Sequence, residues 1–579
     1  MRGCLWIWLV AGLSACIDER YDLDKDIDYT ISVGGDLSVP ASSTEDVTLK
    51  NLLDMEENSM VQADEDGFYS MVKTNAVQQT DVKIDSILFN DEMFDSQAEV
   101  SFLEFPEAMI QMLPDDEPVE APIRNISTSA SLEKTDITEE LLAIDNAVTE
   151  LPMDLEYRFL ENNDIQRLIL KEGYEIRFPE YITISASEET DAALFEVDSR
   201  SVRIKQDLEI GTDGLTIPVM IRMLDFTKMP EGSGFRYPSY MKIDFDIVST
   251  GQVYFYKKDF PADRNRWNIH FARIPRLKTG KILNCKVKVA PDIDMEVEPI
   301  WFDNVPDFLS DEEVVVDLYD PKMYMTVTNT APVDVNVNAE IFSHRKDGSV
   351  TSIEVGDRHG TPILIPKSVE NYIICFHKQD SEITDADQSI QLPNIDILMG
   401  KMPEYISVEN IESEVPDEYY YVRPGRTYSV TTEGRIEAPL AFCEETNLVY
   451  EKTMDGWHED LDKYEIRAAT VTMEAENRIP LDMELEAEPV DVDGNRIEGI
   501  AVAVDKDIKA GNQEQSTVTS LNIDLTSQEG AMRNLDGLVL RANATVPSDY
   551  RAQQLNENQT LALRDIRIKI KGGIKIDLN

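Results

Sequence analysis

The nucleophilic, acid–base and metal-binding residue types form no recognisable catalytic set in this sequence. There is no GxSxG nucleophile motif, glycine-rich phosphate loop or HExxH zinc motif, and the histidines stand apart at positions 270, 344, 359, 377 and 458. Carboxylate pairs held about 5 to 10 Å apart can hydrolyse glycosides, but among 111 acidic residues any chosen pair is arbitrary. We therefore predict no catalytic residue, no metal site and no cofactor.

Two acidic runs approach the spacing of a calcium-binding loop. Asp22, Asp24 and Asp26 have the required odd spacing, but isoleucine and valine occupy the positions of the invariant glycine and the final glutamate. The run 64–67 reaches Lys73 at that final position. Both runs are predicted to be solvated turns.

Two aromatic clusters are the best candidates for ligand binding. One comprises Tyr254, Tyr256 and Trp267, and the other comprises Tyr419, Tyr421 and Arg423. Exposed aromatic rings can stack on sugars or anchor protein contacts. Because alternate residues of a strand face opposite ways, at least one ring of the run 419–421 is expected in a core.

The elements that position these side chains are predicted to be β-strands. Period-two alternation recurs along the body with turn residues between the runs, for example at 202–210, 241–247, 253–256, 286–289, 314–318, 323–328 and 469–475. Helices are expected to be few and short, with candidates at 47–55 and 138–144. We predict an all-β chain built as an array of about three to four Ig-like β-sandwich modules.

An internal repeat supports related modules. Asn329 to Glu340 and Asn477 to Glu488 share an Asn-x-x-Pro start, alternating apolar residues and a following Asp-Gly turn. Proline is tolerated at the start of a strand, and Asp-Gly suits a tight hairpin. A fainter copy is 152–157. A second signature, Pro-Glu-Tyr-Ile, follows residues 178 and 402, with a looser relative at 105–107, and it is expected to mark strand starts.

The C-terminal run 566–579 alternates apolar and basic residues around Gly572-Gly573. Residues directly opposite each other share a face of a sheet. We therefore predict a hairpin with a three-residue loop, 571–573, that pairs Ile570 with Ile574. The alternative is one long strand with a glycine bulge.

The first sixteen residues have the pattern of a targeting signal. Arg2 is followed by an apolar run, 4–13, and then by Leu13-Ser14-Ala15-Cys16. About ten apolar residues are too few to span a bilayer but match a secretory h-region. The pattern resembles a bacterial lipoprotein signal peptide, which implies cleavage before Cys16 and lipidation of that cysteine. The alternative is an ordinary buried N-terminal element.

An acidic stretch, 17–28, follows Cys16 and is too polar to build a core, so we expect a tether. Together with the run 33–37 it resembles Bacteroidota lipoproteins of unknown role. The resemblance covers about the first forty residues. It implies anchoring in the outer membrane through lipidated Cys16, facing the cell surface, with a periplasm-facing orientation as the alternative.

The net charge of -57 excludes a nucleic-acid partner, because binding phosphates requires a basic footprint. Beyond Cys4 and Cys16, the cysteines are Cys285, Cys375 and Cys443, an odd set without metal-ligand spacing. At most one disulfide could form among them, and Cys285 lies on the apolar parity of a strand.

Domain limits follow the turn-rich segments. We predict a signal peptide at 1–15, a tether at 16–29, an N-terminal β domain at 30–146, and β-sandwich domains at 147–304, 305–438 and 439–579. The expected function is a non-catalytic, membrane-anchored envelope lipoprotein with a structural or binding role, acting as an adhesin, appendage component or glycan-binding accessory. Its partner would be a glycan or a surface protein. The alternative is a secreted glycan-active hydrolase.

Overall fold

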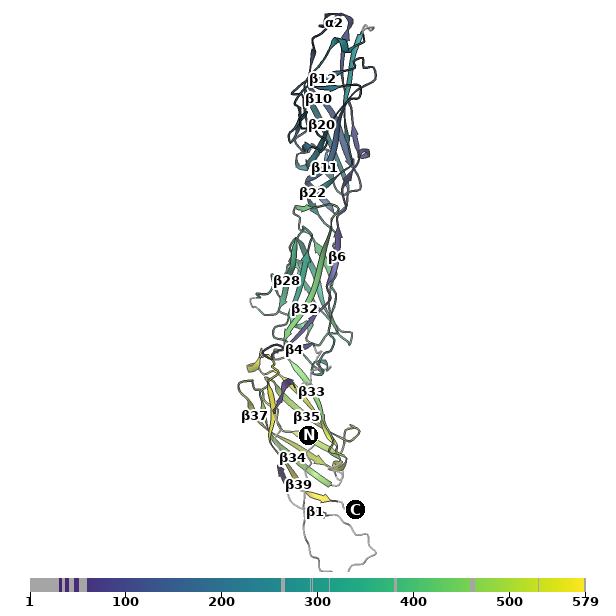
Figure 1. Ribbon diagram of the computed structural model, residues 1–579. Helices are drawn as coiled ribbons and strands as arrows, with labels where there is room; N and C mark the ends of the chain where they lie inside the picture. Colours follow the sequence, from purple (N-terminus) through teal and green to yellow (C-terminus); the bar gives the residue numbers. More distant parts are fainter. Residues whose placement is uncertain are drawn as a thin grey trace, which may run out of the picture.

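The chain is all-β, and its described residues form three β-sandwich modules stacked end to end in a rod (Figure 1). The computed structural model describes residues 31–33, 37–40, 46–50, 60–261, 266–291, 293, 295–311, 313–379, 383–458, 464–528 and 531–576. We name the modules base, middle and top, with the base at the end that holds β1 and the top at the end that holds α2. The prediction of an array of β-sandwiches with few short helices is confirmed.

The base module contains both the first and the last strands. One sheet has the order β1-β39-β34-β37-β36, with β2 and β3 also on β39, and the other has the order β33-β38-β35. The strands are β1 (Ile31–Val33), β2 (Leu37–Pro40), β3 (Val47–Thr48), β33 (Asn447–Met454), β34 (Tyr464–Asn477), β35 (Asp482–Val490), β36 (Ile500–Val504), β37 (Thr517–Ser527), β38 (Gly537–Thr545) and β39 (Thr560–Ile576).

The middle module repeats this plan. One sheet has the order β29-β28-β24-β32-β5-β4 with β6 also on β32, and the other has the order β23-β30-β25-β26 with β27 on β25. The strands are β4 (Val61–Ala63), β5 (Tyr69–Thr74), β6 (Gln78–Lys83), β23 (Ile300–Trp301), β24 (Lys322–Asn329), β25 (Val335–His344), β26 (Val350–Val355), β27 (Ile363–Ile365), β28 (Val369–His377), β29 (Gln388–Gln391), β30 (Tyr405–Glu414) and β32 (Thr427–Pro439). A short helix, α3 (Asp307–Ser310), lies between β23 and β24 in the chain.

The top module is the largest. Its sheets have the orders β15-β16-β13-β20-β10-β8 and β14-β18-β11-β21-β9, and β31 from the return path extends the second through β22. The elements are β7 (Leu88–Phe89), β8 (Phe94–Ser96), β9 (Glu99–Pro106), α2 (Glu107–Met112), β10 (Val119–Lys134), β11 (Leu141–Phe159), β12 (Leu168–Leu170), β13 (Glu175–Arg177), β14 (Ile182–Ala186), β15 (Phe195–Val197), β16 (Ser201–Ile204), β17 (Leu208–Ile210), β18 (Leu215–Asp225), β19 (Gly234–Arg236), β20 (Tyr240–Phe255), β21 (Arg266–Leu277), β22 (Gly280–Val289) and β31 (Tyr420–Val422).

The predicted N-terminal domain at 30–146 does not form. This segment instead runs from the base to the top of the rod and adds strands to every module. Strands β1 to β3 pair with β39 in the base, β5 and β6 pair with β32 in the middle, and β9 pairs with β21 in the top. The chain then returns from the top to the base. The contiguous limits predicted for the four β domains are wrong for this reason, since each module combines an early segment with a late one. The predicted signal peptide and tether lie outside the described residues.

The repeated Asn-x-x-Pro segment is confirmed as a repeated structure. Asn329 is fully buried at the end of β24, and its Nδ2 donates to the carbonyls of Val333 and Pro366, both at 3.0 Å. Its Oδ1 accepts from the backbone N–H of Ala331 at 2.9 Å. The asparagine therefore holds the turn that carries the chain from one sheet of the middle module to the other.

Asn477 does the same between β34 and β35 of the base module. It is fully buried, donates to the carbonyls of Leu481 at 3.1 Å and Lys509 at 3.0 Å, and accepts from the N–H of Ile479 at 2.8 Å. The fainter copy at 152–157 differs, because it lies within β11 after a register shift between Val148 and Leu151 and does not start a strand.

Several local predictions are wrong because long-range pairing overrides them. The C-terminal run is one strand, β39, whose register on β34 shifts where Gly572-Gly573 oppose one residue, so the bulge alternative is correct and the hairpin is not. The expected helix at 138–144 is a turn leading into β11. Of the other expected helix, 47–55, Val47–Thr48 form β3, residues 49–50 are helical and residues 51–55 lie outside the described residues. Pro106 precedes α2 rather than a strand, and 314–318 contributes isolated bridges.

The modules share a continuous apolar core. Alternation places Leu151, Met153, Leu155 and Tyr157 of β11 inward, each at most 1% exposed. Buried residues of all three modules belong to one contiguous cluster, while a smaller cluster in the base module surrounds Met532. The rod is therefore packed across its module boundaries.

Candidate functional site

The first predicted aromatic cluster lies near the end of the top module that carries α2. Tyr254 lies near the end of β20, on its solvent-facing side. Its hydroxyl donates to Asp207 at 2.8 Å. The ring of Tyr256 lies edge-on to Tyr254, with centroids 6.0 Å apart. Burial raises the pKa of Tyr254 to about 12, and the hydrogen bond to Asp207 contributes to the same shift. Both tyrosines are half-buried, so one edge of each remains at the surface.

Two cations complete this surface, which we call the tip patch: Tyr254, Tyr256, Arg167 and Lys258. The guanidinium carbon of Arg167 lies 5.5 Å from the Tyr256 centroid, and the Lys258 ammonium lies 5.0 Å from it. Arg167 is held by Asp259 at 3.3 Å. The arrangement presents aromatic and cationic groups together, which suits a ligand with a flat apolar face and a negative or polar edge.

Trp267 does not belong to the tip patch. It is 5% exposed and stacks on Phe260 with ring centroids 4.1 Å apart and an interplanar angle of 6°. The predicted ligand role for Trp267 is therefore wrong. The pairing of β21 with β9 directs the Trp267 side chain towards the core of the top module.

The second predicted cluster lies at the junction of the top and middle modules. Tyr419 and Tyr421 are 42% and 61% exposed, while Tyr420 between them is 2% exposed. The expectation that alternation would send one ring of this run into the core is confirmed. Arg423, also exposed, follows two residues after Tyr421, and its backbone N–H donates to the hydroxyl of Tyr428 at 3.2 Å.

Two lysines of β22 join these residues, and we call the set the junction patch: Tyr419, Tyr421, Arg423, Lys286 and Lys288. Lys286 pairs directly with Tyr421 across the two strands. The ammonium groups of Lys286 and Lys288 each lie 5.4 Å from the Tyr419 centroid.

Each lysine of the junction patch also pairs with a carboxylate. Lys286 lies 2.6 Å from Asp145, and Lys288 lies 2.7 Å from Asp417. These hydrogen-bonded partners raise the pKa of both lysines, so both remain charged at neutral pH. Within a strongly acidic chain, the patch is a local concentration of aromatic and basic side chains.

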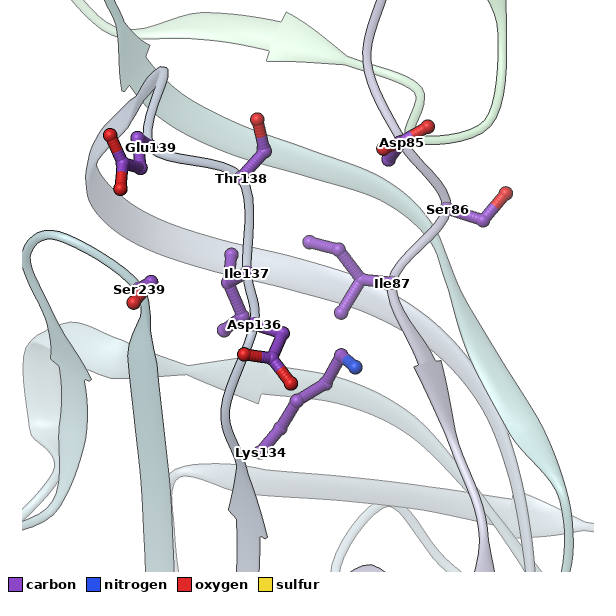
Figure 2. Close-up of a pocket in the computed structure, with 9 residues that line it drawn as sticks. All are labelled: Asp85, Ser86, Ile87, Lys134, Asp136, Ile137, Thr138, Glu139 and Ser239. Atoms are coloured by element: carbon purple, nitrogen blue, oxygen red, sulfur yellow. The ribbon is translucent and has the colours of Figure 1, made fainter.

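A polar pocket of about 310 Å³ lies beside the same junction (Figure 2). Its walls come from the segment after β6, which includes Asp85, and from the segment between β10 and β11, which includes Asp136 and Glu139. Figure 2 shows Asp85 and Glu139 on opposite sides of the view. The pocket collects carboxylates, but the residues that line it include no aromatic side chain.

The body cysteines are free thiols in the core. Cys285, Cys375 and Cys443 are all buried and unpaired by disulfides. Burial raises the pKa of Cys285 to about 12 and that of Cys375 to about 11. A thiol that stays protonated is a poor nucleophile, so these cysteines are structural.

Two further features bear on the predicted sites. In the described part of the chain, no group of three or more His, Cys, Asp or Glu side chains is arranged to hold a metal ion. The run 64–67 forms the turn between β4 and β5, where Asp64 accepts from the backbone N–H groups of Asp66 and Phe68. The acidic run at 22–26 and Cys16 lie outside the described residues.

Within the described ranges, no helix is both long and apolar enough to cross a membrane.

Comparison with known proteins identifies no family for this chain. No protein-family model matches the chain, and no curated protein does. Among solved structures, the chain is similar to one described as a secreted protein from Parabacteroides distasonis, with 14% sequence identity, 50% of this chain and 83% of that chain covered, and a TM-score of 0.35. A structure of the triple jelly-roll fold and turret assembly of an archaeal virus aligns over 84% of this chain and 91% of its own, at 9% identity and a TM-score of 0.10. TM-scores this low carry no inference about function.

Sequence reasoning found the tyrosines of both patches and Arg423 of the junction patch, but it missed the other four cations. Lys286 and Lys288 stand on the polar parity of β22, which the alternation alone could have shown. Their position beside Tyr419 depends on the pairing of β22 with β31, two strands more than a hundred residues apart. Arg167 and Lys258 lie outside regular strands, so periodicity gave no signal for them.

Proposed function

We propose that this chain is a lipoprotein of the bacterial cell envelope, anchored in the outer membrane through lipidated Cys16, with a structural or binding role and no catalytic role. The observation that carries the proposal is the direction of the rod. Strand β1, which begins fifteen residues after Cys16, lies at one end, and α2 lies at the opposite end (Figure 1). The tip patch belongs to the α2 end, because Lys257, next to Tyr256, donates to the carbonyl of Leu113 directly after α2. A lipid on Cys16 would hold the base at the membrane and present the top module away from it.

The tip patch supports a binding role for the presented end. Tyr254, Tyr256, Arg167 and Lys258 are fixed on strand ends and short loops of a packed module, and they combine ring faces with cations. Such surfaces bind glycans or protein partners without a sequence motif, because strand edges and loops of sandwich modules provide the contacts. The partner proposed here is a glycan or a protein of the cell surface.

The hydrolase alternative gains no support from the junction pocket. Hydrolysis of a glycoside needs two carboxylates on either side of one bond and a surface that holds the sugar. The pocket of Figure 2 contains carboxylates, but none of the residues that line it could stack on a sugar ring.

A capture experiment on intact cells tests the proposal. Wild-type protein and the Cys16→Ala variant are expressed at equal levels, and bound partners are recovered after crosslinking. We expect the wild type to remain in the outer-membrane fraction with its partner and the variant to be lost from that fraction.

Patch variants then locate the binding surface. Tyr256→Ala removes the central ring of the tip patch, and Tyr421→Ala removes an exposed ring of the junction patch without touching the tip. Capture lost in Tyr256→Ala and retained in Tyr421→Ala would assign binding to the tip. Capture retained in both variants would contradict a role for the aromatic patches.

A further inference from the structure

The N-terminal segment, residues 31–106, is the covalent path from the base of the rod to its tip, and we call it the N-terminal arm. It contributes edge or near-edge strands to all three modules in turn. In the base, β1, β2 and β3 supply three, four and two residue pairs with β39. In the middle, β5 and β6 supply five and six pairs with β32, and in the top, β9 supplies eight pairs with β21.

Side chains fasten the arm between these ladders. Asn75 joins β5 and β6 to β32, because its backbone N–H donates to the carbonyl of Gly434 at 3.1 Å and its Oδ1 accepts from the Gly434 N–H at 2.6 Å. At the base, Lys50 pairs with Glu557 at 3.1 Å, and Asp46 pairs with Arg564. The arm is therefore held along its path as well as by its strands.

The direction of the strands decides how the ladders respond to force. All arm strands that pair with β39, β32 and β21 are antiparallel to them. Tension between the N-terminus and the tip acts along the strand axis, so it loads the pairs of each ladder together in shear. Tension between the two chain ends acts differently, because Ile31 lies opposite Ile576 and the pairs of β1 would open one after another.

We propose that the N-terminal arm carries the tension between the membrane anchor and a partner bound at the tip, with each module resisting extension of the arm by shear of its own ladder. This inference rests on the proposed function for the anchor and the partner. The ladders themselves are properties of the described fold.

The arm also contains one element arranged to yield first. Strand β4 runs antiparallel to β5, so the arm reverses direction there, and only three residue pairs join the two strands. Tension on residue 60 would peel β4 from β5 pair by pair. Fully straightened, the ten residues from Met60 to Tyr69 would span about 30 Å. We expect this short extension before the ladders on β39, β32 and β21 fail.

Single-molecule pulling on the full chain tests the proposal. One handle is attached to the thiol of Cys16 in protein made without the signal peptide. The other is attached either at the tip, through Met112→Cys, or at the C-terminus. Met112 is 84% exposed, and the body cysteines are buried, so a thiol-specific handle selects the intended sites. Forced unfolding reports the unfolding barrier. Shear breaks several residue pairs at once, whereas unzipping breaks them one after another. We therefore expect a rupture force about twofold or more higher in the anchor-to-tip geometry than in the anchor-to-C-terminus geometry.

A nicked rod provides the matched control. A protease site placed at the exposed Glu65 cuts the arm in the turn between β4 and β5, and the same site placed at Asp347 cuts a comparable exposed turn between β25 and β26, outside the arm. We expect the cut at Glu65 to lower the anchor-to-tip force and the cut at Asp347 to leave it unchanged.

Equal forces in the two pulling geometries, or equal effects of the two cuts, would overturn the proposal. The pulling assay uses neither a membrane nor a tip partner. A failure of Cys16 lipidation in cells would therefore refute the anchor while leaving the force ratio intact, so the two failures are distinguishable.

Discussion

The buried asparagine of the repeated segment offers the sharpest test of how the modules are built. Replacing Asn329 with alanine removes the two bonds that its Nδ2 donates to Val333 and Pro366 and the one that its Oδ1 accepts from Ala331. At about 1 kcal/mol net for each bond, the free energy of unfolding should fall by about 3 kcal/mol. That loss corresponds to a change of about 150-fold in the unfolding equilibrium constant. Asn477→Ala in the base module should cost a similar amount, because its three bonds are equivalent.

Urea denaturation followed by tryptophan fluorescence measures this loss. Once the signal peptide is removed, one tryptophan remains for each module: Trp267 in the top, Trp301 in the middle and Trp457 in the base. Thr330→Ala is the matched control, since this exposed neighbour bonds only at the surface and should cost about 0.5 kcal/mol or less. A loss below about 1 kcal/mol in both asparagine variants, or one equal to the control, would refute the account of the repeat.

Three further outcomes follow from the core. The thiols of Cys285, Cys375 and Cys443 should be unreactive towards a thiol reagent in native protein at pH 8 and should all react in urea; fast labelling of native protein would contradict their burial. Stability should decrease as the pH rises from about 9 to about 12, because burial raises the pKa of Cys285 to about 12 and that of Tyr181 likewise to about 12, so these groups ionise first in the unfolded chain; denaturation at pH 8 and pH 11 measures the difference, and equal stability would count against it. Gly511→Ala should destabilise the base module by about 2 kcal/mol or more, since a Cβ there would lie 2.0 Å from the carbonyl oxygen of Asn477; a variant with unchanged urea midpoint would show that this approach is not tight.

The class of fold could be predicted from the sequence because strand alternation is a local signal. The Asn-x-x-Pro segments at 329 and 477 also gave the relation between two modules, since the same local residues make the same turn. The exposed positions of Tyr419 and Tyr421 around a buried Tyr420 followed from period two in the same way.

The module limits could not be predicted, because they depend on pairing between distant segments. Strand β5 belongs to the middle module through β32, and the backbone N–H of Tyr69 donates to the carbonyl of Leu555 at 2.9 Å. Neither contact leaves a trace in local composition. The C-terminal run failed for the same reason: a hairpin and a bulged strand both suit its alternation, and pairing with β34 decided between them.

The tip patch was predicted only in part. Its tyrosines stand out in the sequence, but Arg167 and Lys258 reach Tyr256 from separate loops, and the stacking of Trp267 on Phe260 depends on the fold of the whole top module. Side chains of a site are found from sequence when one element carries them. These side chains come from several elements.

Labelling of a single tip thiol on intact cells tests whether the rod is anchored at Cys16 with its tip presented outward. Met112→Cys places a thiol at an 84% exposed position of α2, and the body cysteines are buried. We expect a membrane-impermeant maleimide to label this variant on intact cells, and we expect the added Cys16→Ala change to remove the labelled protein from the cells. Labelling that requires prior permeabilisation of the outer membrane, or cell association that survives the loss of Cys16, would contradict this arrangement.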